Sequence, residues 1–173
     1  MIRKAANTDI PRISAIYDRI HDAEEAGRLT TGWLRGIYPT RATAREALAA
    51  GELYVVEDDG SVVAAARINH VQPPAYTQVQ WKYTAPPEQI MVLHTLTVDP
   101  LLAGRGYGRE FIRFYESYAL DHGCSVLRID TNARNAAACA MYARYGYIES
   151  GIVPTVFNGI PNVMLVCMEK RLG

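Results

Sequence analysis

Two segments of the chain carry residues whose types and spacing could do chemistry. The first is a turn of alternating glycines, Gly104, Gly106 and Gly108, which stands directly before an amphipathic segment. Glycine permits a tight turn, and a helix that begins here would present unpaired N–H groups and a partial positive charge. Such a turn can hold a pyrophosphate, and Arg105 and Arg109 would add positive charge. Alone the pattern is weak, because similar turns also merely connect strands to helices.

The second segment places an amide, a small residue and a phenol on one helix face. Asn135, Ala138 and Tyr142 follow one another at spacings i, i+3 and i+7. The small residue would let a ligand approach, and the phenol carries an exchangeable proton with an ordinary pKa of about 10. A lone helix tyrosine is more often a core residue. Its combination with the glycine turn favours a functional role.

A dinucleotide-binding fold is the alternative explanation of the glycine turn. That fold requires Gly-x-Gly-x-x-Gly directly after a strand, and an acidic residue about 20 positions later. Asp130 suits the acidic position, but Arg109 occupies the third glycine position, counted from Gly104. Asp99 and Pro100 also separate the turn from the preceding strand. The pattern therefore disfavours a dinucleotide site.

Hydrophobic periodicity and turn residues predict an α+β domain with a mixed sheet, in the element order βααβββαβαββ. One domain is expected over residues 1–173, because this length supports a single sizeable core. Thr8 and Thr40 are predicted helix caps. Strands are predicted over 2–5, 53–57, 61–69, 91–98, 126–131, 148–153 and 163–170, helices over 8–20, 40–50, 107–122 and 135–145, and long loops over 71–89 and 154–162.

Composition argues against several function classes. Lys plus Arg and Asp plus Glu each number 18, so bulk charge gives no reason to expect nucleic-acid or membrane binding. The N-terminus has no signal-peptide pattern, and no apolar run is long enough for a membrane span. Cys124, Cys139 and Cys167 are isolated, and no two histidines share metal-binding helical spacing. A cytoplasmic protein without a metal site is expected, with His21, His70 and His122 at the surface.

Residues 98–147 resemble the core of the GNAT N-acetyltransferases. Their hallmark is Gln/Arg-x-x-Gly-x-Gly/Ala at a helix start, then Asn-x-x-Ala-x-x-x-Tyr-x-x-x-Gly-Phe/Tyr on the next helix. The chain departs at the leading position, where Ala103 stands in place of Gln or Arg, which removes one polar contact and leaves the backbone cradle intact. Every other motif position is met, by Gly106, Gly108, Asn135, Ala138, Tyr142, Gly146 and Tyr147.

The resemblance implies a mostly antiparallel central sheet flanked by helices, in which two central parallel strands splay apart to bind acetyl-CoA. The strand that carries Leu96 and Val98 would hold the pantetheine arm. The glycine turn would hold the pyrophosphate, and the helix that carries Tyr142 would lie at the thioester end. The cofactor-binding residues so implied are Leu96, Thr97, Val98, Ala103, Gly104, Arg105, Gly106, Tyr107, Gly108, Arg109, Asn135, Ala138 and Tyr142.

The implied reaction is direct attack of an amine on the acetyl group in a ternary complex, and it poses two proton problems. The amine must be neutral to attack, and the departing thiolate benefits from a proton. Tyr142 would donate that proton. His94 is the preferred base, since it lies on the cleft strand and histidine titrates near the working pH. Glu88 and Asp130 are second-rank bases, and each could instead bind the positive charge of the substrate.

The acceptor is less well defined by the sequence. Trp33, Tyr38, Trp81 and Tyr83 could line its pocket, although core packing explains each as well. The leading interpretation is a small-molecule amine or amino-acid acetyltransferase. Two alternatives stay open: acetylation of a protein or peptide, and a non-catalytic acyl-CoA-binding module. Homodimers are common in the family, so the resemblance leaves the oligomeric state open.

Overall fold

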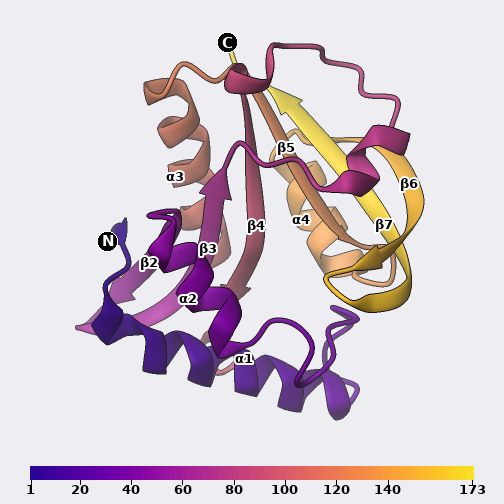
Figure 1. The fold of residues 1–173 in the computed structure, drawn as a ribbon. Helices are drawn as coiled ribbons and strands as arrows, with labels where there is room; N and C mark the ends of the chain where they lie inside the picture. The colour runs from indigo at the N-terminus through magenta and orange to yellow at the C-terminus, as the bar shows by residue number, and fades with distance from the viewer.

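One seven-stranded sheet organises the molecule, in the order β1-β2-β3-β4-β5-β7-β6 (Figure 1). The computed structural model describes every residue from Met1 to Gly173. The predicted element order is confirmed. The strands are β1 (Ile2–Lys4), β2 (Leu53–Asp58), β3 (Ser61–Asn69), β4 (Ile90–Val98), β5 (Val126–Asn132), β6 (Ile148–Phe157) and β7 (Ile160–Arg171), and the helices are α1 (Ile10–Glu25), α2 (Arg41–Ala49), α3 (Tyr107–Asp121) and α4 (Ala136–Arg144).

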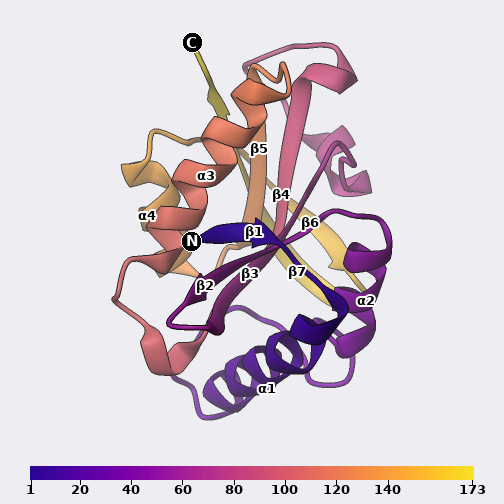
Figure 2. The same ribbon diagram turned by 90° about the vertical axis from the view of Figure 1, so that its left-hand side faces the viewer.

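The helices cover both faces of the sheet. Strand alternation in β2 sends Leu53 and Val55 into a core with α1 and α2, and Tyr54 and Val56 into a core with α3. Figure 2 shows α3 and α4 on one side of the sheet and α2 on the other. None of these helices combines the length and the apolar character that crossing a membrane would require.

The first helix differs from its prediction at both ends. It begins at Ile10, and Thr8 lies in a 3₁₀ turn before it instead of capping it. Asp9 supplies the cap-like contact, since its Oδ2 accepts a hydrogen bond of 2.7 Å from the amide of Ala6. The helix also runs on to Glu25, so His21 is buried, with Nε2 lying 2.9 Å from the carbonyl oxygen of Pro39. The predicted cap at Thr40 on α2 is confirmed.

The C-terminal hairpin is longer than predicted. We expected proline to interrupt both strands, yet Pro154 lies within β6 and Pro161 within β7, and only Asn158 and Gly159 form the turn. The order of the strands in the sheet explains why both prolines are tolerated. β6 is the edge strand, and β7 has no partner on its other side before Met164, so each proline has one side on which no ladder hydrogen bond is needed.

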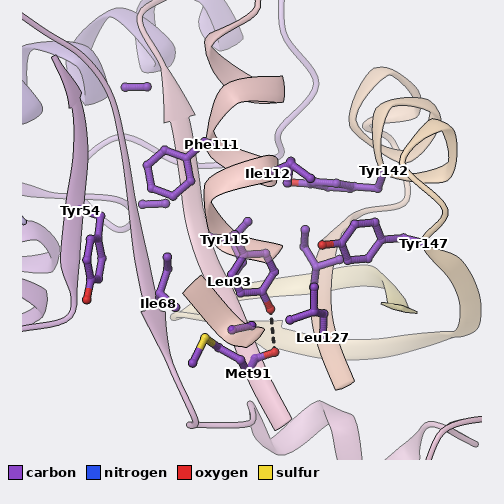
Figure 3. Packing of buried hydrophobic residues seen from close by; sticks show 14 of the residues in the cluster. Tyr54, Ile68, Met91, Leu93, Phe111, Ile112, Tyr115, Leu127, Tyr142 and Tyr147 are labelled. Carbon is purple, nitrogen blue, oxygen red and sulfur yellow. Dashed lines mark hydrogen bonds between the residues drawn. The ribbon is translucent and has the colours of Figure 1, made fainter. Parts of the chain in front are cut away.

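The parallel pair β4 and β5 separates halfway along its length, as the resemblance implied. The pairing runs from Ile90 opposite Val126 to Leu93 opposite Ile129 and stops there, although both strands continue. Just before the separation, the buried hydroxyl of Tyr115 donates to the carbonyl oxygens of Met91 at 2.6 Å and Arg128 at 3.2 Å (the first bond is drawn in Figure 3). Helix α3 therefore braces both strands where they are still joined.

Candidate active site

A cavity of about 700 Å³ opens where β4 and β5 part. Its floor is the diverging strands, one wall is helix α4, and its far end is covered by the connection from α1 to α2 and by the tip of the β6–β7 hairpin. The lining includes residues 94–98 of β4, residues 130–132 of β5, Asn135, Ala138 and Tyr142 beside α4, and Trp33, Tyr38 and Phe157 at the covered end. The cavity thus brings the second predicted motif, at Asn135, Ala138 and Tyr142, together with the diverging strands, whereas the glycine turn is not among its lining residues.

The glycine turn presents free backbone amides at the start of α3. Gly106 is the cap residue, with φ of 91° and no side-chain cap, and the first helical hydrogen bond runs from Glu110 N to Gly106 O at 2.9 Å. The preceding amides therefore have no partner within the helix. Gly108 packs closely, because a Cβ there would lie 3.4 Å from the sulfur of Met141 on α4. A backbone cradle suited to an anion results.

Strand β4 has one free edge beside this cradle. Beyond Leu93 it pairs with β3 alone, as far as Val98 opposite Ala64. The edge that faces β5 can therefore bond an extended ligand in the manner of an added strand. The resemblance assigned this edge to the pantetheine arm and the glycine turn to the pyrophosphate, and both assignments stay predictions.

A bulge in β4 turns consecutive side chains toward the cavity. Thr95 has φ of 54°, and the register against β3 shifts beside it, between Ala65 and Arg67. As a result His94, Thr95 and Leu96 all line the cavity, whereas a regular strand would direct alternate residues away. The hydroxyl of Tyr38 hydrogen-bonds to Thr95 Oγ1 and thereby ties the covering segment to the bulge.

His94 stands in a hydrogen-bond network that fixes its tautomer. Its Nε2 lies 2.8 Å from Oδ1 of Asn69, which also accepts a bond of 2.9 Å from the amide of Val71. Asn69 donates its amide nitrogen to Glu52 at 2.9 Å, so Oδ1 is an acceptor and His94 Nε2 must donate. Burial, helped by the charge of Arg67, lowers the His94 pKa to about 4. The ring is neutral at pH 7, with its lone pair on Nδ1.

Asp130 is a carboxylate in the cavity without a basic partner. Its Oδ2 accepts a hydrogen bond of 2.7 Å from the hydroxyl of Tyr76. Burial raises the Asp130 pKa to about 6, and the Tyr76 bond offsets part of that rise. This carboxylate changes charge close to neutral pH, as a proton acceptor in an active site should.

Tyr142 is buried at the α4 wall of the cavity, with its ring 6.0 Å from that of Tyr147 (Figure 3). Burial raises the Tyr142 pKa well above its ordinary value, and the nearby charge of Asp130 adds to the rise. The phenol therefore keeps its proton at neutral pH.

The structure does not bring three of the predicted substrate residues to the cavity. The guanidinium carbon of Arg128 lies 4.0 Å from the centroid of the Trp81 ring. The amide of Tyr83 donates a 3.2 Å hydrogen bond to the buried carboxylate of Glu169. Glu88 is exposed in a 3₁₀ turn before β4. All three belong to the long crossover between β3 and β4, which packs against the sheet at this point. Trp33, Tyr38 and Asp130 do line the cavity.

Sequence reasoning missed several lining residues. Arg67, Asn69 and Thr95 occupy positions on regular strand patterns, and only the bulge and the pairing of β3 with β4 turn them to the cavity. Phe157 lies in a segment that was expected to be a loop. No local signal in the sequence marks any of the four. No group of three or more histidine, cysteine or acidic side chains gathers in a way that could hold a metal ion.

Comparison with known proteins agrees with this geometry. Residues 15–147, most of the chain, match the sequence model of the Acetyltransferase (GNAT) family. The streptothricin acetyltransferase of Escherichia coli is 30% identical over 83 residues, which cover 48% of this chain and 44% of that protein. The matched stretch therefore spans less than half the length of this relative.

Solved structures show the same fold over the whole chain. A GNAT-family acetyltransferase from Streptococcus agalactiae superposes with a TM-score of 0.81 at 19% identity, covering 100% of this chain and 95% of that one. An acetyltransferase from Salmonella typhimurium, solved with its cofactor acetyl-CoA, superposes with a TM-score of 0.68 at 20% identity, covering 100% and 94%.

Proposed function

The chain belongs to the acetyltransferase (GNAT) family, and from that premise we propose that it is an acetyl-CoA-dependent N-acetyltransferase acting on a primary amine of a small molecule. One observation carries the proposal. The gap between β4 and β5 combines a free strand edge, which ends at Val98 beside Gly108 of the helix-start cradle, with a chamber that holds a protonated phenol and a carboxylate.

The residues of the gap suit acetyl-CoA, which would supply an activated acetyl group. The amides from Gly106 to Arg109 would hold its diphosphate. The free edge of β4 at Leu96 and Val98 would bond the amide groups of its pantetheine arm. Asn135 bonds its own helix start, since its side chain accepts from the amide of Ala138 at 3.2 Å, so we assign it a positioning role.

Tyr142 is the proposed proton donor to the leaving sulfur. Its raised pKa keeps the phenol protonated, and its place on the wall of the gap puts it beside the position proposed for the thioester. A proton delivered as the C–S bond breaks lowers the cost of releasing a thiolate.

Asp130 is the proposed base, in place of His94, which we had preferred from the sequence. His94 with a pKa of about 4 accepts a proton poorly at neutral pH, whereas Asp130 with a pKa of about 6 is mostly ionised and still basic. An ammonium ion would pair with Asp130 on entry and then pass its proton to it. His94 is left as a neutral group that orders one wall of the chamber.

The covered chamber favours a small acceptor over a protein. Trp33, Tyr38 and Phe157 meet edge to face, with ring centroids 5.8 Å apart for Trp33 and Tyr38 and 5.3 Å apart for Tyr38 and Phe157. They come from two separate segments and together line one end of the cavity. A peptide would require an open groove at this end.

A thiol-release assay tests the proposal. Acetyl-CoA would be supplied with a panel of small amines and, in parallel, with short peptides that carry a free N-terminus or a lysine. Release that depends on a small amine is the expected result. Release with peptides alone would favour the protein-acetylation alternative, and tight cofactor binding without release on any acceptor would favour a binding module.

A further inference from the structure

The charges in the cavity are unbalanced. Apart from the neutral His94, Arg67 is the sole basic residue in the lining, and its charge is paired with Glu52 through two of its three nitrogens. Nε and Nη2 of Arg67 each lie 2.6 Å from Oε2 of Glu52, behind the cavity wall. The carboxylate of Asp130 has no such partner, and Glu46 adds a second acidic group at the rim. The chamber therefore offers a net negative charge to whatever enters.

The titratable side chains around Asp130 are phenols and a thiol, which are uncharged at neutral pH. Tyr76 donates to it, and the phenols of Tyr38 and Tyr142 and the thiol of Cys167 feel its charge, each with a raised pKa of its own. The nearest cation on the same strand, Arg128, turns to Gln72, to the carbonyl oxygen of Tyr83 and to the face of Trp81. No side chain thus neutralises the Asp130 carboxylate.

We infer that the acceptor is an amine without a carboxylate beside its amino group, as opposed to an α-amino acid. The inference rests on the proposed function and deepens it. If Asp130 receives the reacting ammonium, an α-carboxylate two bonds away would lie against Asp130 as a like charge, with no free cation to offset it. Juxtaposed like charges in a desolvated site cost several kilocalories per mole.

The aromatic end of the chamber suits the rest of such an amine. Trp33, Tyr38 and Phe157 offer ring edges and faces to an apolar carbon skeleton, and aromatic faces also attract a second cationic group. These three rings supply no cation that could pair with a carboxylate. The acceptor class is therefore a monoamine or diamine with an aryl or alkyl body.

Matched substrate pairs test the inference directly. Tyramine and tyrosine, histamine and histidine, and phenethylamine and phenylalanine differ within each pair only by the α-carboxylate. We expect kcat/KM for the preferred amine to exceed that for its amino acid by about 100-fold or more, as a like-charge penalty of this size predicts. Equal values, or a preference for the amino acids, would overturn the inference.

A variant that removes the ion-pair partner of Arg67 provides the second test. Glu52→Gln leaves Arg67 with an uncompensated positive charge near Tyr38, whose pKa already responds to both Arg67 and Asp130. We expect the amine-to-amino-acid ratio to fall at least tenfold. The matched control is Glu57→Gln, which breaks an ion pair of the same 2.6 Å length with Arg3 at the edge of the sheet, outside the cavity. The control should keep the wild-type ratio, and an equal fall in both variants would contradict the assignment.

Binding measurements separate failure of the inference from failure of the proposed function. Titration of the protein with acetyl-CoA tests the function on its own, since it involves no acceptor. Titration of the CoA-loaded protein with amine and amino acid then tests the inference without turnover. Cofactor binding with equal affinity for both acceptors, or with affinity for neither, would refute the inference and leave the function standing. No cofactor binding would refute the function itself.

Discussion

At the scale of single residues, function depends on the protonation state that each environment imposes. The sequence identified Tyr142, His94 and Asp130 by type and position and favoured His94 as the base, whereas the structure leads us to propose Asp130. The reason is burial. Desolvation lowers the pKa of a base and raises the pKa of an acid, so it weakens His94 and strengthens Asp130 as proton acceptors. Spacing along a strand carries no information about either effect.

Tyr142→Phe should lower kcat by 10- to 1,000-fold and leave the affinity for acetyl-CoA nearly unchanged. The substitution removes only the hydroxyl group that carries the proton, and general acid catalysis contributes about 10² or more. Steady-state kinetics and calorimetry report the two quantities. Tyr145→Phe, at the C-cap of the same helix and outside the cavity lining, is the control. An unchanged kcat in Tyr142→Phe would refute the donor role.

Asp130→Asn should remove the acid limb of the pH profile. In the wild type, kcat/KM should fall below pH of about 6 as Asp130 takes up a proton. Asp130→Asn should be slow with no break in this range, and His94→Ala should keep the break, because the pKa of His94 is about 4. A break near pH 6 that survives in Asp130→Asn or disappears in His94→Ala would reverse the assignment.

The ionised carboxylate of Asp130 should lower the free energy of unfolding at neutral pH. Its pKa is higher in the folded protein than the ordinary 3.8, so the fold favours the protonated form. Stability from this group is therefore present at low pH and is lost as pH rises from about 4 through about 6. Thermal unfolding should show that Asp130→Asn is more stable than the wild type at pH 7.5 and gains nothing at pH 3.5. An equal difference at both pH values would show that ionisation is not the cause.

At the scale of elements, local patterns predicted which segments form but not how they shift against one another. The glycine turn before Tyr107 and the cap at Thr40 follow from residue type. The bulge at Thr95 does not, because a threonine with positive φ has no sequence signature and arises from strained pairing between β3 and β4. The prolines of the last hairpin were misjudged for a related reason, since only sheet order shows that β6 is an edge.

Gly106→Val should abolish acetyl-CoA binding. The position needs φ of 91°, and a Cβ there would stand in open space before the helix start, with only Arg109 near it at 3.8 Å. Gly123→Val is the control, because Gly123 has φ of 72° at the other end of α3 and open space around it. Both variants should lose stability from backbone strain, but only the first should lose binding by calorimetry. Normal binding in Gly106→Val would refute the cradle.

Tyr115→Phe should destabilise the fold by about 1–3 kcal/mol, because it leaves the buried carbonyl groups of Met91 and Arg128 without their donor. Urea unfolding measures the change. Tyr118→Phe is the control: it lies on the same helix, and its hydroxyl accepts a 2.8 Å bond from Tyr54 at a partly buried position. A loss in Tyr115→Phe no greater than in the control would show that the brace between β4 and β5 contributes little.

At the scale of the whole molecule, the sequence predicted the element order and the family resemblance, whereas the acceptor chamber required the assembled structure. Three segments far apart in the chain close it: the connection between α1 and α2, the crossover after β3 and the tip of the β6–β7 hairpin. The zero net charge of the chain also conceals a cavity with an unpaired carboxylate. The net charge sums over the whole chain, whereas the chemistry depends on the charges within this one cavity.

The central claim is that the gap between β4 and β5 binds acetyl-CoA for transfer. The most direct test is calorimetric titration of the wild-type protein with acetyl-CoA. One site per chain is expected, with micromolar affinity and with binding lost in Gly106→Val. Absence of binding by the folded protein at millimolar acetyl-CoA would contradict the claim, because neither the free edge of β4 nor the helix-start cradle would then hold the ligand they are proposed to fit.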